Sequence, residues 1–582
     1  KYTPNMIKMM RSAPARQWSY MTRTTPIMPR FRVANPLFTT NQAHPTCCYS
    51  SLAQEGLVVH SMGGSIGSVP NVTVTELVRS AIVAQDDASR PAITCLASGL
   101  KLSYGELYQR VDAAVAALHA RGFKQGQVMN VHLHNCAQFV VTFLAVAQLG
   151  GTSTTSNPLY TAAELAVQQQ ESGARYVLSS RVYESQVSEA VTTSGIQQVE
   201  WIEDLECFAN QTATAHPTPE LERPIEPSDD LLTLPFSSGT TGVPKGVMLS
   251  HTNIVANIMQ ACHPYIDDLT VADNVLGLLP LFHIYGMTTI MGVTLYSKAH
   301  LVLMPKFEPV QFLEAIQKEH ITVSFLVPPV MLFLLKHPLV DQYNVTSLRW
   351  LVSAAAPLDA STQMLIRERF PDVSIKQGWG LTELSPIATI SRPAESGLPP
   401  IDGSCGVLLS DTSLKVIDVD TGALLPPGEE GELCIGGPQV MKGYLNRPDA
   451  TAQVIDADGF FRTGDIGRID QQGNLFITDR LKELIKVKGL QVAPAEVEGA
   501  LLEIPQLMDA AVVAVPDERS GQAPKAFVVM KAGEQISSEE IISALAKRLA
   551  DFKIPQHIVF IDEIPKSASG KILRRLLLSP QS

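Results

Sequence analysis

The chain has 582 residues, enough for roughly three or four domain-sized units. Hydrophobic residues make up 45% and charged residues 18%, which excludes a chain that is disordered throughout. The formal net charge of −12 argues against a dedicated nucleic-acid-binding protein, because phosphate backbones attract clustered Lys and Arg. The 8 cysteines form no Cys-x-x-Cys pair, so the sequence carries no signature of a disulfide scaffold or a zinc ribbon.

The first 54 residues differ in charge from the rest of the chain. They contain seven Lys or Arg residues and no Asp or Glu, whereas the remainder carries 38 basic and 57 acidic residues. An Arg-rich, acid-free segment with Ser and Thr is typical of an organelle transit peptide. We therefore expect a leader over residues 1–54 that directs mitochondrial import. A basic tail with no address, and hence a cytoplasmic protein, is the alternative.

Neither end of the chain suggests another destination. The chain begins with Lys1 and not with Met, so its native start and the cleavage site of the leader stay open. The C-terminal tripeptide Pro580-Gln581-Ser582 is not a peroxisomal signal. The most apolar segment, 325–340, is shorter than the roughly 20 residues of a membrane span and contains two prolines and a lysine, so no span is predicted.

Helix and strand patterns alternate along most of the chain. Capping boxes, apolar residues at helical spacing and short apolar runs define the elements. The predicted elements are helices from Ser103 and Thr161, strands over 128–132 and 176–178, a helix over 309–320, strands over 322–327 and 348–353, and a helix that ends before Pro371. This alternation favours an α/β fold in which largely parallel sheets are covered by helices.

The last hundred residues have a separate α+β pattern. Strands are predicted over 511–515, 527–530 and 558–561, with helices that start near Pro494 and Ser537. The charged run Asp479–Lys482 precedes them, and its lack of Gly and Pro favours a specific hinge over a slack linker. We therefore expect a large N-terminal domain over 68–480 and a small mobile C-terminal domain over 481–582.

The segment Ser237-Ser-Gly-Thr-Thr-Gly-Val-Pro-Lys-Gly246 is the strongest chemical signature in the sequence. Its glycines and hydroxyl groups can present backbone N–H and side-chain donors to an anion, and Lys245 adds a positive charge. It is not a Walker A loop, because Pro244 stands where that motif needs its second Gly. Composition alone would equally allow a Gly- and Thr-rich surface turn.

The whole decapeptide resembles the phosphate-loop signature of the adenylate-forming enzymes, which include acyl-CoA synthetases, peptide-synthetase adenylation domains and beetle luciferases. The resemblance covers about residues 70–575, and four further segments agree in the order of the family: Gln377–Glu383, Thr463–Asp465, Asp479–Glu496 and Pro565–Arg574. Within this superfamily the chain looks most like 4-coumarate–CoA ligases and related acyl-CoA synthetases, on the segments Phe282–Gly286, Val327–Val330 and Leu481–Glu496.

The resemblance implies an ATP site. The phosphate loop would grip the β- and γ-phosphates, Thr382 would touch the α-phosphate, and Glu383 would hold Mg²⁺, for which a carboxylate oxygen is a suitable ligand. Asp465 and Arg480 resemble the pair that binds the ribose. The full set of implied ATP-binding residues is Ser237, Ser238, Gly239, Thr240, Thr241, Gly242, Lys245, Gln377, Gly378, Trp379, Gly380, Leu381, Thr382, Asp465, Arg480, Gln491 and Lys571.

The resemblance also implies catalytic, acyl and CoA sites. Lys571 would bridge the carboxylate and the α-phosphate during adenylation, and His283 would stack at the carboxylate, so the implied catalytic residues are Lys571, His283, Thr382 and Glu383. The implied acyl pocket is small and apolar, as an aromatic or medium-length aliphatic tail requires, and consists of Tyr285, Val352, Ala355, Gly380, Pro386 and Ile387. Lys306, Lys488 and Gly489 would contact CoA, and Lys482 would be the hinge.

These residues predict an ATP-dependent carboxylate–CoA ligase that uses ATP, Mg²⁺ and CoA and passes through an acyl-adenylate. The acid would be hydroxycinnamate-like or medium-chain aliphatic. A luciferase-type monooxygenase is the main alternative; a carrier-loading module and a catalytically inactive interaction protein are the others. Three departures from the plant ligases leave the acid itself open: Lys376 and Ala354 stand where Gly is usual, and Trp379, which can still stack on adenine, where Tyr or Phe is usual. The oligomeric state is open too.

Overall fold

A computed structural model describes most of the chain from residue 57 onward. The described residues are 57–82, 85–205, 219–237, 244–263, 269–356, 358–392, 401–481, 483–487, 490–517, 521–546, 548–549, 551–566 and 570–578. The predicted leader, 1–54, lies outside them, and the mitochondrial destination stays a prediction.

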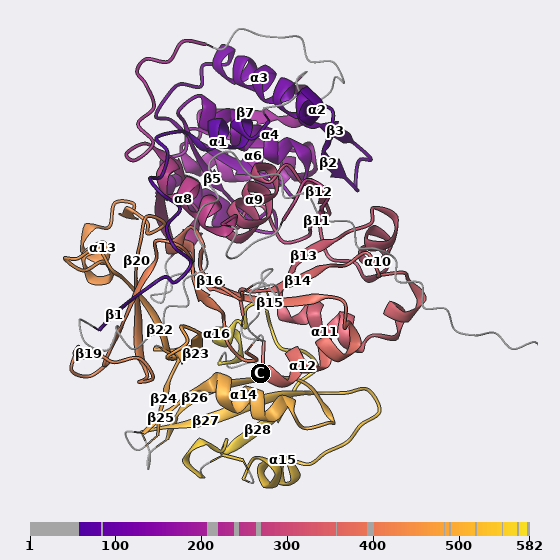
Figure 1. Ribbon diagram of the computed structural model, residues 1–582, viewed down its shortest axis with the longest axis vertical. Helices are drawn as coiled ribbons and strands as arrows, with labels where there is room; N and C mark the ends of the chain where they lie inside the picture. Colours follow the sequence, from indigo (N-terminus) through magenta and orange to yellow (C-terminus); the bar gives the residue numbers. More distant parts are fainter. Residues whose placement is uncertain are drawn as a thin grey trace, which may run out of the picture. The chain divides into compact units, whose positions relative to one another are not determined.

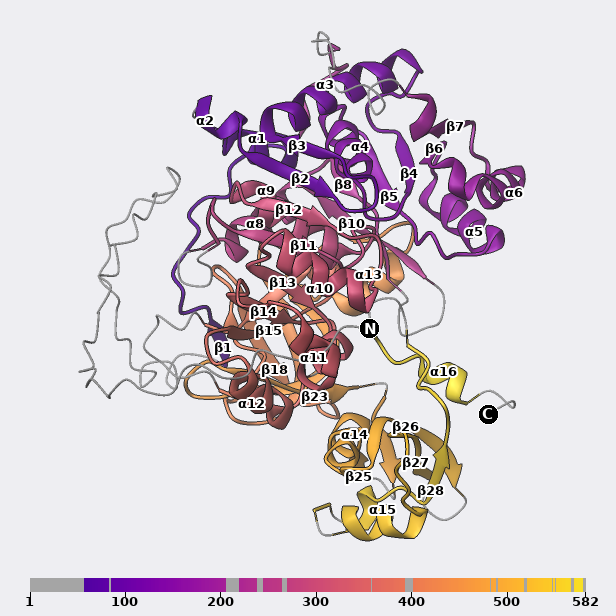
Figure 2. The same ribbon diagram turned by 90° about the vertical axis from the view of Figure 1, so that its right-hand side faces the viewer.

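The first sheet of the large domain is mainly parallel. Its strands follow the order β21-β10-β8-β5-β4-β6-β7, with β9 beside β10, and those from β8 to β7 run parallel. Helices α4, α5 and α6 connect successive parallel strands of this sheet (Figures 1 and 2). The strands are β4 (Val128–His132), β5 (Thr152–Thr155), β6 (Tyr176–Ser179), β7 (Gln198–Trp201), β8 (Leu231–Thr233), β9 (Phe236–Ser237), β10 (Lys245–Ser250) and β21 (Gly443–Tyr444).

The second sheet has the order β17-β16-β15-β14-β13-β11-β12-β2-β3. Strands β15 to β2 in this order are parallel, and the outer strands β16, β17 and β3 are antiparallel to their neighbours. Strands β13 and β14 are buried throughout, as a parallel sheet covered on both faces requires. The strands are β2 (Pro91–Cys95), β3 (Lys101–Ser103), β11 (Asn274–Gly277), β12 (His300–Leu303), β13 (Val323–Leu326), β14 (Trp350–Ser353), β15 (Ser374–Gly380), β16 (Ile387–Ile390) and β17 (Val407–Leu408).

The third sheet of the large domain is antiparallel, which the alternating pattern did not predict. Its order is β1-β18-β20-β22-β23, with β19 beside β18, and every pair in it is antiparallel. The strands are β1 (Val58–His60), β18 (Ser413–Ile417), β19 (Leu424–Leu425), β20 (Gly431–Gly436), β22 (Phe461–Ile469) and β23 (Leu475–Arg480). Strand β23 ends at the predicted domain boundary.

The C-terminal residues form a sheet with helices on both faces. Strands β26, β27 and β28 lie side by side, with β28 parallel to β27 and β26 antiparallel to it (Figure 2). Side chains alternate along β26: Val512 packs with α14 and α15, while Val513 packs with α16 on the other face. The strands are β24 (Ile485–Val487), β25 (Leu490–Val492), β26 (Leu507–Asp517), β27 (Gly521–Met530) and β28 (His557–Phe560).

Three predicted capping boxes are confirmed. Ser103, Thr161 and Ser537 each accept from the backbone N–H of a Glu three residues on, and that Glu side chain accepts from the backbone N–H of the capping residue. The helices are α1 (Val74–Ser80), α2 (Gln85–Ala88), α3 (Tyr104–Ala120), α4 (Ala137–Gln148), α5 (Ala162–Ser172), α6 (Glu184–Ser194), α8 (His251–Ala261), α9 (Val293–Tyr296), α10 (Pro309–Lys318), α11 (Pro328–Lys336), α12 (Ala360–Arg369), α13 (Pro448–Val454), α14 (Pro494–Leu502), α15 (Ser538–Leu545) and α16 (Arg574–Leu577). Among the described residues, no helix combines the length and apolarity that crossing a membrane would require.

Candidate active site

Several of the predicted site residues lie at or after the carboxyl ends of neighbouring parallel strands. Strands β15, β14, β13, β11 and β12 are successive in the second sheet, so their carboxyl ends meet at one edge. Ligands bind at this edge in open α/β sheets. The residues that follow these strands are Trp379–Glu383 after or at the end of β15, Ala355 after β14, Val327 after β13, His283 and Tyr285 after β11, and Lys306 after β12.

The phosphate-loop segment connects two paired strands. Ser237 ends β9 and lies opposite Lys245, the first residue of β10, in the antiparallel register. The Lys245 ammonium lies 4.9 Å from the centroid of the Tyr444 ring. The predicted phosphate contacts Ser238, Gly239, Thr240, Thr241 and Gly242 lie outside the described residues.

The Glu383 carboxylate is buried and held by two hydrogen bonds. It is 7% exposed, and its Oε1 accepts hydrogen bonds from the Ser237 hydroxyl at 3.1 Å and from the Tyr444 hydroxyl at 2.9 Å. Burial, and then the nearby Glu383 charge, raise the pKa of Tyr444, so this hydroxyl remains a donor. The structure thus brings the phosphate-loop strand and the Gln377–Glu383 motif together. Thr382 begins the single turn η6 (Thr382–Leu384) that carries Glu383.

Tyr444 is a site residue that the sequence analysis missed. It lies in β21, which pairs with β10, and it contacts both Lys245 and Glu383. It belongs to none of the five motif segments. An aromatic residue after Gly443 was its only local signal, and such a pair is too common to indicate a site.

Asp465 and Arg480 lie opposite each other in strands β22 and β23. Arg480 Nε is 3.1 Å from Asp465 Oδ1, and the indole Nε1 of Trp379 donates to Asp465 Oδ2 at 2.8 Å. Burial raises the pKa of Asp465, while the charge of Arg480 and the Trp379 hydrogen bond act in the opposite direction. The predicted ribose pair and the predicted adenine-stacking residue are therefore in direct contact.

Lys571 lies among the charged groups of this site. Burial, reinforced by the Arg480 charge, lowers the pKa of Lys571 to about 8, against the opposing influence of Glu483, Asp465 and Glu383. The preceding Gly570 has φ of +77°, and a Cβ there would lie 3.3 Å from Val327. The loop of the C-terminal domain thus sits against the start of α11, with the lysine near the carboxylates of the large domain.

Tyr285 is buried at the start of the π-helical segment η4 (Tyr285–Gly292), and His283, two residues before it, is half-buried. Burial, and to a lesser extent the charge of Lys571, lower the pKa of His283 to about 4, so its ring is neutral at pH 7. The Tyr285 ring packs edge-on against Phe325 with centroids 6.2 Å apart. Its buried hydroxyl has no hydrogen-bond partner within the described part of the chain.

The remaining predicted acyl-pocket residues come from β14, β15 and β16. Val352 is 2% exposed in β14, and Ala355 beyond it has a positive φ of 71°. Only glycine fits at position 380 without a steric clash, because a Cβ there would lie 1.9 Å from the Pro386 carbonyl oxygen. Ile387, which begins β16, pairs with Gly380 in the sheet.

Gln377 and Gly378 lie where β15 enters the site. The Gln377 amide accepts from Gln363 at 2.6 Å and donates to the Cys405 sulfur at 3.3 Å, so its side chain bonds within the protein. Leu381 N donates to the Pro386 carbonyl at 3.0 Å, which closes the turn after β15. The contacts of Gln377, Gly378 and Leu381 with a nucleotide stay predictions.

The predicted CoA and hinge residues are less completely described. Lys306 is exposed after β12. Lys482, Lys488 and Gly489 lie outside the described residues, and Gln491 lies in β25, where its backbone is described. Their predicted roles therefore rest on the sequence.

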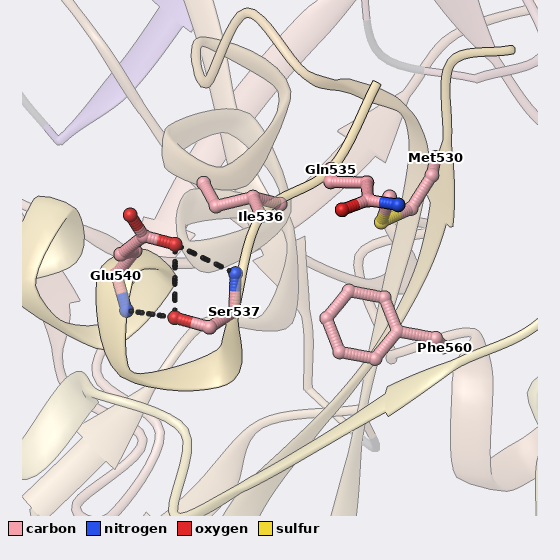
Figure 3. Close-up of a pocket in the computed structure, with 6 residues that line it drawn as sticks. All are labelled: Met530, Gln535, Ile536, Ser537, Glu540 and Phe560. Carbon is pink, nitrogen blue, oxygen red and sulfur yellow. Dashed lines mark hydrogen bonds between the residues drawn. The ribbon is translucent and has the colours of Figure 1, made fainter. Parts of the chain in front are cut away.

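A shallow pocket in the C-terminal domain has no such chemistry (Figure 3). Two of its polar residues, Ser537 and Glu540, already bond to each other as the capping box of α15, with hydrogen bonds of 2.9, 2.9 and 3.2 Å. The lining residues are Met530, Gln535, Ile536, Ser537, Glu540 and Phe560. This pocket is therefore a cap beside an apolar surface and not a second reactive centre.

Comparison with known sequences agrees with the geometry. The model of the AMP-binding enzyme family matches residues 81–445, and that of the AMP-binding enzyme C-terminal domain matches residues 496–571. The chain is 39% identical over 495 residues to 4-coumarate-CoA ligase 1 of Narcissus pseudonarcissus, covering 83% of this chain and 90% of that protein. It is also 39% identical to 4-coumarate–CoA ligase 2 of Nicotiana tabacum, covering 84% and 91%.

Solved structures show the same architecture. ATP-bound MatB from Rhodopseudomonas palustris is 28% identical, with a TM-score of 0.77, over 87% of this chain and 98% of that one. The amide bond synthetase McbA from Marinactinospora thermotolerans is 26% identical, with a TM-score of 0.76, over 87% and 99%. Because the family model covers residues 81–445 and relatives of 39% identity match most of both chains, the chain belongs to the AMP-binding enzymes, the adenylate-forming family.

Proposed function

We propose that this protein is an ATP-dependent carboxylate–CoA ligase. The carboxylate attacks the α-phosphate of ATP, giving an acyl-adenylate and pyrophosphate; the CoA thiol then displaces AMP and forms the thioester. The observation that carries the proposal is the buried Glu383 carboxylate, which accepts hydrogen bonds from Ser237 of the phosphate-loop strand and from Tyr444 and so brings two of the family's motif segments together. The likeness to 4-coumarate–CoA ligases over most of both chains supports CoA as the acceptor.

The first half-reaction brings two anions together, so the site must supply positive charge and alignment. Lys571 supplies an ammonium between the carboxylate and the α-phosphate. Lys245 meets the terminal phosphates from β10, and Thr382 donates to the α-phosphate. The neutral His283 ring lies against the acid without adding a charge of its own.

Glu383 fits a magnesium ion. Its Oε1 accepts from Ser237 and Tyr444, which leaves Oε2 outside these two hydrogen bonds. Within the described part of the chain, no group of three or more His, Cys, Asp or Glu side chains is placed to hold a metal. Mg²⁺ in nucleotide sites is bound by one or two carboxylates together with the phosphates, and it would offset the phosphate charge. We therefore assign Glu383 as its protein ligand.

The acid is hydroxycinnamate-like or a medium-chain aliphatic acid. Val352 and Ile387 offer apolar walls, and both are buried. The buried Tyr285 hydroxyl lacks a partner among the described residues, which supports an acid that carries its own hydrogen-bonding group, such as a ring hydroxyl.

A panel of acids tests the proposal. The protein is incubated with ATP, Mg²⁺, CoA and one acid at a time, and AMP and acyl-CoA are measured by mass spectrometry. We expect AMP and thioester in equal amounts with a hydroxycinnamate or a medium-chain acid. Light emission with luciferin and O₂, with no thioester from any acid, would instead identify the monooxygenase alternative.

A further inference from the structure

A hydrogen bond joins two parts of the predicted nucleotide site that lie far apart in the sequence. Trp379 is the penultimate residue of β15 in the mainly parallel second sheet, and Asp465 lies in β22 of the antiparallel third sheet. The indole Nε1–H of Trp379 donates to Asp465 Oδ2 at 2.8 Å. The residue expected to stack on adenine thus also holds the carboxylate expected to bind the ribose.

The two oxygens of Asp465 have different surroundings. Oδ2 accepts from Trp379, whereas Oδ1 has no hydrogen-bond donor among the described residues, although Arg480 Nε lies 3.1 Å away as an ion-pair contact. The residue is 3% exposed. Buried acceptors are normally satisfied, so an open oxygen on a buried carboxylate points to a donor that arrives with a ligand. A ribose hydroxyl is such a donor.

The chemistry of the indole makes this arrangement specific. Indole N–H donates and cannot accept, so it fixes one carboxylate oxygen without competing for ribose protons. Phe at this position would stack on adenine but would have no donor. Tyr would carry its hydroxyl at the far end of the ring, and that group can both donate and accept.

We propose that Trp379 is a positioning residue for the nucleotide: its indole N–H holds Asp465 Oδ2 and so presents Oδ1 to the ribose hydroxyls. The inference rests on the proposed ATP-dependent function, since Asp465 must meet ribose. It predicts that the protein discriminates between ribose and deoxyribose through Trp379 as well as through Asp465. A merely structural hydrogen bond would not affect that discrimination.

The test compares the parent protein with Trp379→Phe, which keeps a ring for stacking and removes the donor. The measured quantity is kcat/KM for ATP, 2′-deoxyATP and 3′-deoxyATP in the acid-dependent reaction. We expect Trp379→Phe to lower kcat/KM for ATP by about 10-fold or more, as the loss of a hydrogen bond to a charged group does. The preference for ATP over at least one deoxynucleotide should fall by about 5-fold, because the open oxygen is no longer held in place.

Three further measurements separate this role from general damage. Trp201→Phe removes an indole from β7, outside the site, and should leave both kcat/KM and the preference unchanged. Calorimetric binding of AMP and 2′-deoxyAMP reports the preference without turnover. In an Asp465→Ala background, Trp379→Phe should change the preference no further, because the shared partner is gone.

An equal fall for all three nucleotides, or no fall at all, would overturn the inference. In either case the parent protein would still consume ATP in an acid-dependent reaction. A parent protein that shows no acid-dependent use of ATP would instead count against the proposed function itself.

Discussion

We propose Lys571 as the residue whose charge bears most directly on adenylation. Burial lowers its pKa to about 8, and the Arg480 charge acts in the same direction. An amine with this pKa is mostly protonated at neutral pH, so it supplies a cation where a carboxylate and a phosphate must approach. Because Lys571 follows Gly570, which packs against Val327 of the large domain, this role would tie the C-terminal loop to the first half-reaction.

Replacing Lys571 should separate the two half-reactions. We expect Lys571→Ala to slow acyl-adenylate formation by about 10²–10³-fold, the effect of removing one preorganised charge from a reacting centre. Conversion of supplied acyl-adenylate to acyl-CoA should continue, because that step does not need a cation at the attacking carboxylate. Lys553→Ala, at a lysine paired with Glu496 in the same domain, is the matched control. Equal loss of both steps in Lys571→Ala would reject this assignment.

The pKa of Lys571 also predicts a pH dependence. A lowered pKa means that the amine loses its proton at a lower pH than an ordinary lysine does. The single-turnover adenylation rate should therefore decline as pH rises through about 8. Lys571→Arg keeps its charge over this range, so its slower reaction should lack the alkaline decline. The same decline in both proteins would assign the titration to another group.

At the scale of elements, hydrogen bonds and ion pairs lie close to the predicted boundary between the domains. Asp479, near the end of β23, accepts from the backbone N–H of Ala495 at 3.1 Å, and burial raises the pKa of Asp479 to about 6. Beyond the boundary, Arg574 bonds Glu498 at 2.7 Å and lies 3.4 Å from Glu483. A swing of the C-terminal domain about Lys482 would break the Asp479–Ala495 hydrogen bond. The Arg574 contacts would be kept, because both partners of each contact lie in the moving domain.

A proline at the predicted hinge should block that swing. Proline fixes φ near −65°, whereas a hinge residue must change its backbone dihedrals. We expect Lys482→Pro to retain adenylation and to lose at least about 10-fold in thioester formation, with Lys482→Ala as the control that keeps backbone freedom. Stopped-flow measurement of adenylation and of thioester formation, made separately for each variant, checks this expectation. Undiminished thioester formation in Lys482→Pro would place the hinge elsewhere.

The elements divide into those that local sequence predicts and those that it does not. Capping boxes at Ser103, Thr161 and Ser537 were predictable because the bonds span three residues. The antiparallel third sheet was not predictable, because β1 pairs with β18 across some 350 residues of chain and no local pattern indicates such a distant pairing. The place of Tyr444 beside Glu383 was not predictable for the same reason, because this contact depends on β21 pairing with β10.

At the scale of the whole molecule, parallel strand order explains why the site lies where it does. Residues as distant in sequence as His283 and Glu383 lie at the same edge of the sheet because both follow carboxyl ends of its parallel strands. The motif segments were recognisable from sequence, and so was the family. Which side chains touch, such as Trp379 and Asp465, required the structure.

The predicted leader concerns the cellular location of the protein. We propose that residues 1–54 direct import into mitochondria, on the strength of their seven basic residues and lack of acids. A fluorescent fusion of the full chain should reach mitochondria, and one that lacks residues 1–54 should not, while purified protein without them keeps its activity. A full-length fusion that stays in the cytosol would contradict this.

The central claim is that one site activates a carboxylic acid as its adenylate. Exchange of labelled pyrophosphate into ATP measures that step alone, because it requires reversible formation of the acyl-adenylate and needs no CoA. We predict exchange that depends on a hydroxycinnamate or medium-chain acid and is abolished in Glu383→Gln, which removes the proposed Mg²⁺ ligand. Exchange that occurs equally without any acid, or no exchange with any acid of the panel, would contradict the account.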